Sequence, residues 1–232
     1  MFAVIFIVQP KKNHFDDYLN LAKSLKPALE KIDGFIDNER FGSKRTEGRV
    51  LSLSSWRDEK AVIRWRTLGA HHEVQEKGRF EVFEDYHLRV GEIVADNDIP
   101  SGQKLGEQRF DVTEIGAAKV MTISELSPTK GEKPASTDLG ADLGLPKNGS
   151  GGVIDHEVFE SIYNPGKLLL LTSWRDGADK LWKPRELAGG KLRHRNVRII
   201  RDYGMSDRRE APQFYPEVKK TVQKSDRAAI AG

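Results

Sequence analysis

The sequence predicts an α+β protein made of two ferredoxin-like βαββαβ repeats, which together form one pseudo-dimeric α/β barrel within a single chain. Two observations lead to this fold class. Segments of the first half recur in the second half at a constant offset, and apolar runs alternate with helical patterns in the order βαββαβ. With 232 residues, of which 38% are hydrophobic and 31% charged, the chain has room for two small globular units.

The repeat is visible in two long blocks. Residues 34–42 (GFIDNERFG) recur as 152–160 (GVIDHEVFE) with five of nine positions identical, 118 residues later. Residues 49–58 (RVLSLSSWRD) recur at the same offset as 167–176 (KLLLLTSWRD) with six of ten identical. Two shorter matches extend the alignment. They are Gln9-Pro10 with Ser127-Pro128 and, after a one-residue deletion, Asp85-Tyr86 with Asp202-Tyr203. We interpret the pattern as a tandem duplication.

The first repeat shows each element of the unit in turn. Its opening run from Phe2 to Val8 is apolar throughout, which is typical of a strand buried on both faces. The next segment has apolar residues at helical spacing and ends at Gly34. Asp58 is placed to cap a second helix. The predicted elements are strand 2–8, helix 14–32, strand 35–41, strand 49–56, helix 58–77 and strand 80–94.

The packing follows from the two-sided first strand. Helices cover only one face of a βαββαβ sheet, so the other apolar face needs a second cover, and we expect the two sheets to face each other with the helices outside. In the second half, only a short helix around 137–143 is predicted in place of the first long one. The predicted organisation is a first repeat (1–95), a linker (96–117), a diverged second repeat (118–205) and a C-terminal extension and tail (206–232).

Composition excludes several classes of function. The chain has no cysteine, so disulfides, thiolate catalysis and cysteine-ligated metal centres are ruled out. Its 38 basic and 35 acidic residues give a net charge of only +3, which argues against a dedicated nucleic-acid binder. No apolar stretch approaches the ~20 residues of a membrane span. The opening apolar run is short and lacks a preceding basic region. We therefore expect a cytoplasmic protein with neither membrane nor nucleic acid as a partner.

The second predicted helix carries the sharpest candidate site. On a continuous helix, Trp65 and His72 are seven residues apart and share a face, while His71 points about 120° away. An indole beside an imidazole suits a flat aromatic ligand and offers a group that titrates near neutral pH. The alternative is a packed tryptophan with a hydrogen-bonded histidine. Trp182 matches Trp65 in the second repeat, but Gly189 stands seven residues after it, so we expect one such site per chain.

Other polar residues give weaker signals. Strand alternation over 86–90 places His87 and Arg89 opposite the apolar face; we expect this side to meet solvent, with the cavity between the sheets as the alternative. The basic stretch 191–209 predicts a solvated strand face, with a phosphate, nucleic-acid or acidic partner as the alternative. Neighbouring His71 and His72 point apart on a helix and have no third ligand, so no metal site is expected.

The string of Trp65-Arg66, His71-His72, Gln75, Gly78-Arg79 and residues 86–90 (YHLRV) resembles the antibiotic biosynthesis monooxygenase (ABM) family of the dimeric α/β-barrel superfamily. The resemblance covers residues 1–95 well and 118–205 more weakly. It implies cofactor-independent oxygenation of a small phenol- or quinol-type aromatic substrate. By this resemblance Trp65 and His72 are the catalytic candidates and Arg79 a substrate-binding one, to which we add His71, Tyr86 and, through the repeat, Trp182.

The same resemblance leaves two other functions open. Related haem-degrading proteins use an asparagine on the first strand and a histidine about ten residues after the helix tryptophan. This chain has no asparagine in 2–9 and has Gln75 at the second position, so haem binding depends on His71 or His72 as a substitute ligand. The other alternative is a barrel that binds a small ligand without catalysis. We expect no cofactor, and either a monomeric pseudo-dimer or a homodimer.

Overall fold

The computed structural model describes residues 1–129, 138–175, 177, 180 and 182–213. Eight antiparallel strands close into a barrel in the order β1-β3-β2-β6-β7-β5-β8-β4. The strands are β1 (Phe2–Pro10), β2 (Phe35–Ser43), β3 (Val50–Trp56), β4 (Phe83–Asp96), β5 (Val120–Pro128), β6 (Val153–Ser161), β7 (Leu168–Trp174) and β8 (Gly190–Gly204).

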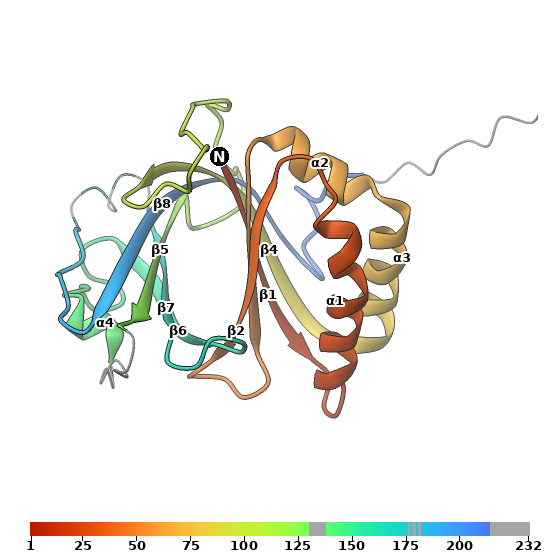
Figure 1. The fold of residues 1–232 in the computed structure, drawn as a ribbon, viewed down its shortest axis with the longest axis horizontal. Coiled ribbons are helices and arrows are strands. Elements are labelled where there is room, and N and C mark those ends of the chain that lie inside the picture. Colours follow the sequence, from red (N-terminus) through yellow and green to blue (C-terminus); the bar gives the residue numbers. More distant parts are fainter. Residues whose placement is uncertain (130–137, 176, 178–179, 181, 214–232) are drawn as a thin grey trace, which may run out of the picture.

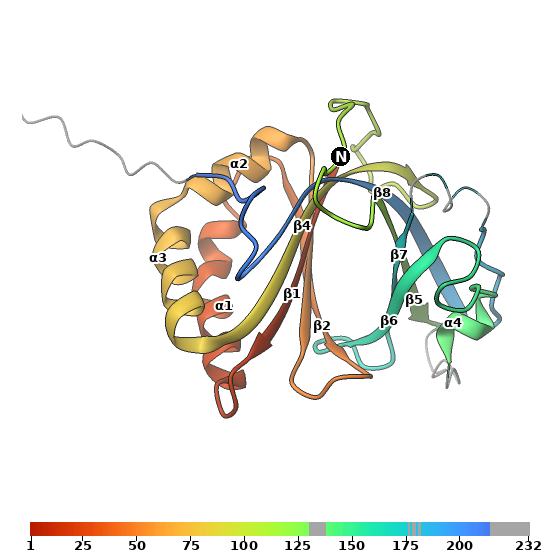
Figure 2. The same cartoon turned by 180° about the vertical axis from the view of Figure 1, so that it is seen from behind.

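The helices lie outside the barrel and mostly on one half of it (Figures 1 and 2). Three cover the first four strands, and a π-helical turn precedes β4. One helix of four residues stands between β5 and β6. They are α1 (Phe15–Leu29), α2 (Glu59–Thr67), α3 (Gly69–Lys77), η1 (Gly78–Val82) and α4 (Leu139–Asp142). Among the described residues, no helix is long and apolar enough to cross a membrane.

The α+β fold and the element order of the first repeat are as predicted. The second half keeps its four strands, but α4 is all that stands in place of the first long helix. The two sheets do not remain separate layers. They join edge to edge where β2 pairs with β6 and where β4 pairs with β8, which removes the open strand edges that each sheet would otherwise expose.

The two halves pair their strands in the same register. Trp56 of β3 lies opposite Phe2 and Phe35, and Trp174 of β7 lies opposite Val120 and Val153, each 118 residues further along, with the irregularity of β2 repeated in β6.

The last strands follow a different offset. Arg89 lies opposite Ile5 and Arg195 opposite Ile123, so β8 matches β4 at an offset of 106 residues. The predicted match of Asp85-Tyr86 with Asp202-Tyr203 is therefore wrong. The connection between β7 and β8 lacks counterparts of α2 and α3 among its described residues, and β8 consequently begins earlier than the sequence match suggested.

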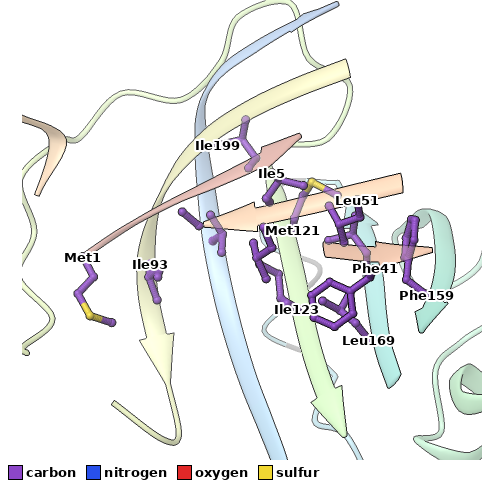
Figure 3. Packing of buried hydrophobic residues seen from close by; sticks show 14 residues of the cluster. Met1, Ile5, Phe41, Leu51, Ile93, Met121, Ile123, Phe159, Leu169 and Ile199 are labelled. Carbon is purple, nitrogen blue, oxygen red and sulfur yellow. The ribbon is translucent and has the colours of Figure 1, made fainter. Parts of the chain in front are cut away.

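The first strand is buried on both faces, as predicted. Met1, Ala3 and Ile5 belong to the cluster that fills the middle of the barrel, and Figure 3 shows side chains of several strands meeting there. Phe2 and Val8 point the other way, into clusters beneath the helices. Burial of this kind is the main stabilising contribution to a barrel of this size, so β1 forms the shared wall of both cores.

The second predicted helix is not continuous. It begins as expected at Asp58, whose side chain accepts a hydrogen bond from the Ala61 amide. It breaks at Leu68, which has an extended backbone (φ −66°, ψ 125°), and α3 starts at Gly69. The break changes the direction of every side chain beyond it, which decides the geometry of the predicted helix site.

Candidate functional site

The predicted pairing of Trp65 with His72 on one helix face is wrong, because the chain breaks at Leu68. The side chain that lies against Trp65 is His71. The two rings stack with centroids 4.0 Å apart and an angle of 18° between their planes. His71 Nδ1 donates a hydrogen bond to the Trp65 carbonyl oxygen at 2.9 Å. His72 instead lies 3.7 Å from Glu76.

The other predicted site residues do not gather around this pair. The Arg79 guanidinium lies over the ring of exposed Phe80, 5.5 Å from its centroid. Trp182 packs in a separate cluster on the second half, against Trp174, and donates to the Gly144 carbonyl oxygen. Trp65 and His71 therefore contact each other and none of the other predicted site residues discussed above. The catalytic roles of Trp65 and His72 remain predictions.

The position of His71 in the stack lowers the pKa of its imidazole. Burial lowers its pKa to about 4 from 6.5, and neighbouring His72 adds to the effect, while the hydrogen bond to Trp65 opposes it. Because the folded pKa lies below the unfolded one, the native state disfavours the proton. Above pH 6.5 the imidazole is neutral in both the folded and the unfolded state, so it does not change the free energy of unfolding. As pH falls from about 6.5 to about 4, the unfolded state takes up the proton first and stability is lost.

We expect wild-type protein to lose up to ~3 kcal/mol more stability over this pH range than His71→Phe, since each pKa unit corresponds to about 1.4 kcal/mol. Phenylalanine keeps the ring stack but does not titrate. The measurement is urea denaturation of both proteins at several pH values. Parallel losses in the two proteins would show that His71 does not resist protonation.

A cavity of about 620 Å³ opens inside the barrel at the end where β1 and β8 finish and β4, β5 and β6 begin. Its walls combine apolar, basic and acidic side chains. The apolar ones include Ile7, Ile115, Met121, Ile154 and Leu171. The arginines, histidines and acidic residues are Arg45, Arg49, Arg89, His87, His156, Asp85, Asp155, Glu157, Asp202 and Asp207.

One linked group of three side chains connects β4 with β8 in this cavity. Asp202 accepts a hydrogen bond from His87 Nε2 through one carboxylate oxygen and from Arg89 Nε through the other, at 3.0 Å. Burial raises the pKa of Asp202, but the bond from His87 and the charge of Arg89 outweigh it and hold the pKa below its ordinary value. Asp202 is therefore a carboxylate that orients both partners. His87 and Arg89 face the cavity, which is the alternative given for this side of the strand. The expected contact with solvent holds for His87, whose side chain is 42% exposed, but not for Arg89, which is 15% exposed.

The C-terminal extension lines the mouth of the cavity. Met205, Ser206 and Asp207 belong to its wall. Glu210 accepts hydrogen bonds from the Asp202 amide at 2.7 Å and from the Thr113 hydroxyl at 2.8 Å, which ties this segment to the linker. Tyr86, one of the predicted substrate-binding residues, is among the residues that line the cavity. Its hydroxyl receives a hydrogen bond from Arg208. Residues 214–232 of the predicted tail lie outside the described residues.

The opposite end of the barrel is filled by ion pairs. Arg195, 1% exposed, bonds Glu125 and donates to the Ser55 hydroxyl. Lys167 bridges Glu125 and Glu39 at 2.6 Å each. Arg193 pairs with Asp96 at 2.8 Å. The basic stretch is therefore not a solvated strand face at these positions, because Arg193 and Arg195 point into the barrel.

The residues offered for haem do not fit that group. His71 is stacked on Trp65, and its Nδ1 is engaged with a backbone oxygen. Neither the cavity in the barrel nor a smaller one of about 220 Å³ beside Lys44 and Asn148 is lined by His71 or His72. Within the described part of the chain, no three histidine or acidic side chains are grouped so as to hold a metal ion.

Sequence reasoning missed Asp202, and it placed the cavity only second among the two environments considered for His87. The available signal was the alternation over 86–90, which separates His87 and Arg89 from the apolar face. The partner could not be found in the same way, because the repeat alignment placed Asp202 opposite Asp85. The observed register instead makes Asp202 the counterpart of Asp96, 106 residues earlier.

Comparison with known proteins adds the following. A family model described as antibiotic biosynthesis monooxygenase matches residues 1–77. A Pyricularia oryzae protein named jasmonate monooxygenase ABM is 43% identical over 221 residues, covering 93% of this chain and 99% of the relative. Among solved structures, an antibiotic biosynthesis monooxygenase is 16% identical with a TM-score of 0.37, covering 41% of this chain and all of its own. A conserved protein from Methanosarcina mazei is 20% identical with a TM-score of 0.36, covering 38% and 88%.

Proposed function

The chain belongs to the antibiotic biosynthesis monooxygenase family, and from this premise we propose that it oxidises a small organic substrate inside the barrel without a cofactor. The observation that carries the proposal is the position of His87. It lies in the wall of the cavity and is held by a carboxylate, which is the arrangement of a general base. Trp65 and His71 stack on each other, and neither lines this cavity.

The proposed reaction uses the substrate as its own reductant. A phenol or quinol with an activated methylene group gives one proton to His87, and the resulting anion transfers electrons to dioxygen. Dioxygen takes four electrons, all from the methylene carbon, which becomes a ketone. One oxygen atom enters the ketone and the other leaves as water, so no external electron donor is needed. The positive charge that His87 gains is stabilised by Asp202.

The proposed substrate class is tested by a panel. It contains phenols and quinols with activated methylene groups and also jasmonate, the compound in the fungal relative's name. Simple hydroxylation draws only two electrons from the substrate, so each compound is also tested with NADPH. The readouts are oxygen uptake and incorporation of ¹⁸O from labelled dioxygen. We expect turnover in protein treated with a chelator and freed of bound chromophores. Uptake that requires added haem, flavin or metal would overturn cofactor independence.

Two alternatives are outcomes of the same test. Saturable binding without oxygen uptake for the whole panel would favour a barrel that binds a small ligand without catalysis. If activity depends on Trp65, His72 and Arg79 but not on His87, the reaction occurs at the helix site predicted from the sequence and not in the barrel cavity.

We also infer that the two halves arose by tandem duplication, so that one chain forms the barrel that would otherwise need two units. The equal register of β1–β3 with β5–β7 supports this. Sedimentation analysis would show whether the pseudo-dimer stays monomeric or pairs again.

A further inference from the structure

Arg89 is a guanidinium with donors to spare inside the cavity. Its side chain is 15% exposed and lines the cavity wall. Of its five N–H groups, Nε donates to Asp202. Within the described residues, neither terminal nitrogen makes a hydrogen bond or ion pair. Arginine side chains in enclosed sites normally place their terminal N–H groups on acceptors.

The opposite end of the barrel shows what such an arginine binds. Arg195 has the position of Arg89, since it lies opposite Ile123 as Arg89 lies opposite Ile5. A terminal nitrogen of Arg195 contacts the carboxylate of Glu125, two residues further along the strand. The residue at the matching place beside Arg89 is Ile7, 118 residues before Glu125. At this one position, therefore, one end has the carboxylate of Glu125 and the other has the apolar side chain of Ile7. The carboxylate that Arg89 does meet, Asp202, bonds its Nε and not its terminal nitrogens.

We infer that the cavity binds an organic acid, whose carboxylate pairs with Arg89 as the Glu125 carboxylate pairs with Arg195. A carboxylate matches the paired terminal N–H groups of a guanidinium. The apolar part of the acid would lie against Ile7, Met121 and Leu171, which line the same cavity. The inference deepens the proposed function by naming the substrate class, but acid binding itself does not depend on turnover.

The other charged groups of the cavity are largely matched among themselves. Glu157 bonds both Arg45 and Arg49, and Arg45 also pairs with Asp155. Asp207 is paired with Arg209. Near Arg89, Asp202 is shared with His87, and Asp85 lies at the mouth. A ligand carboxylate on Arg89 places a second acidic group beside one cation, as Glu39 and Glu125 share Lys167 at the opposite end.

The test compares acids with their uncharged amides by isothermal titration. The probes are butanoate, octanoate and phenylacetate, each beside its primary amide. We expect at least one acid to bind saturably and its amide about tenfold more weakly or worse, as for a charge-assisted pair. Arg89→Gln should weaken the acid by a similar factor and leave the amide unchanged. Arg64→Gln, which removes a guanidinium from the exposed surface of α2, is the matched control.

A second variant tests the comparison with the other end. Ile7→Glu supplies a carboxylate at the place of Glu125 and should exclude the acid by occupying Arg89, while circular dichroism reports whether the barrel is intact. The inference is overturned if no acid binds more tightly than its amide, or if Arg89→Gln retains wild-type affinity for the acid. Acid binding that depends on Arg89, with no oxygen uptake on any substrate, would remove the proposed reaction and leave this inference standing.

Discussion

Arg195→Met is expected to destabilise the protein by about 3 kcal/mol, the lower end of the loss seen when one partner of a buried ion pair is removed. Arg195 is 1% exposed and bonds both Glu125 and the hydroxyl of Ser55. Methionine fills much of the volume but leaves Glu125 with one cation, Lys167. That remaining partner keeps the loss from being larger. Because a domain of this kind has only about 5–15 kcal/mol of stability in total, the effect is large.

The control for this prediction comes from the other end of the barrel. Arg89→Met makes the same change at the matching position. Within the described part of the chain the guanidinium there bonds Asp202 alone, and Asp202 keeps His87 as a partner. We expect a loss of about 1 kcal/mol there, the value of a typical single hydrogen bond. Urea denaturation of both variants measures the difference. Equal losses would mean that the ion pairs around Arg195 contribute nothing beyond those around Arg89.

The strands could be predicted because their signals are local. The run from Phe2 to Val8 is apolar on both faces, and β1 does form the wall between two cores. The repeated serine-tryptophan ends of the third strands of the two halves, at Trp56 and Trp174, identified matching positions that the register confirms. Such features depend only on the order of residues within one strand, so they can be recognised from the sequence alone.

The site could not be predicted in the same way, because it depends on one event with a weak local signal and one with none. The break at Leu68 has no proline to mark it, and the glycine that follows, Gly69, is a weaker signal that a continuous helix also tolerates. The break turns His71 rather than His72 toward Trp65. The closure of the barrel through β4 and β8 brings Asp202 to His87, 115 residues away. Strand alternation could separate His87 from the apolar face, but it could not show that the other face lines a cavity.

Asp202→Asn is expected to reduce kcat about 10²- to 10⁴-fold, the range that a positioned general base contributes. An asparagine amide at this place either donates toward His87 or accepts from it more weakly, so the imidazole loses the partner that fixes its orientation and stabilises its charged form. His87→Gln should lose a similar factor, and the double variant should lose little more than either single variant, because the two residues act as a unit. His72→Ala is expected to retain wild-type kcat.

Asp96→Asn is the matched control, since Asp96 holds Arg193 at the opposite end in the position that Asp202 holds here. It makes the same chemical change to a buried carboxylate far from the cavity. It should cost stability and leave kcat unchanged when both proteins are assayed well below their melting temperatures. If Asp202→Asn and Asp96→Asn lower kcat equally, the Asp202 carboxylate stabilises the folded protein and does not assist His87 in the reaction. If only His72→Ala lowers kcat, the base lies on the helix face, and the cavity around His87 is not where the reaction occurs.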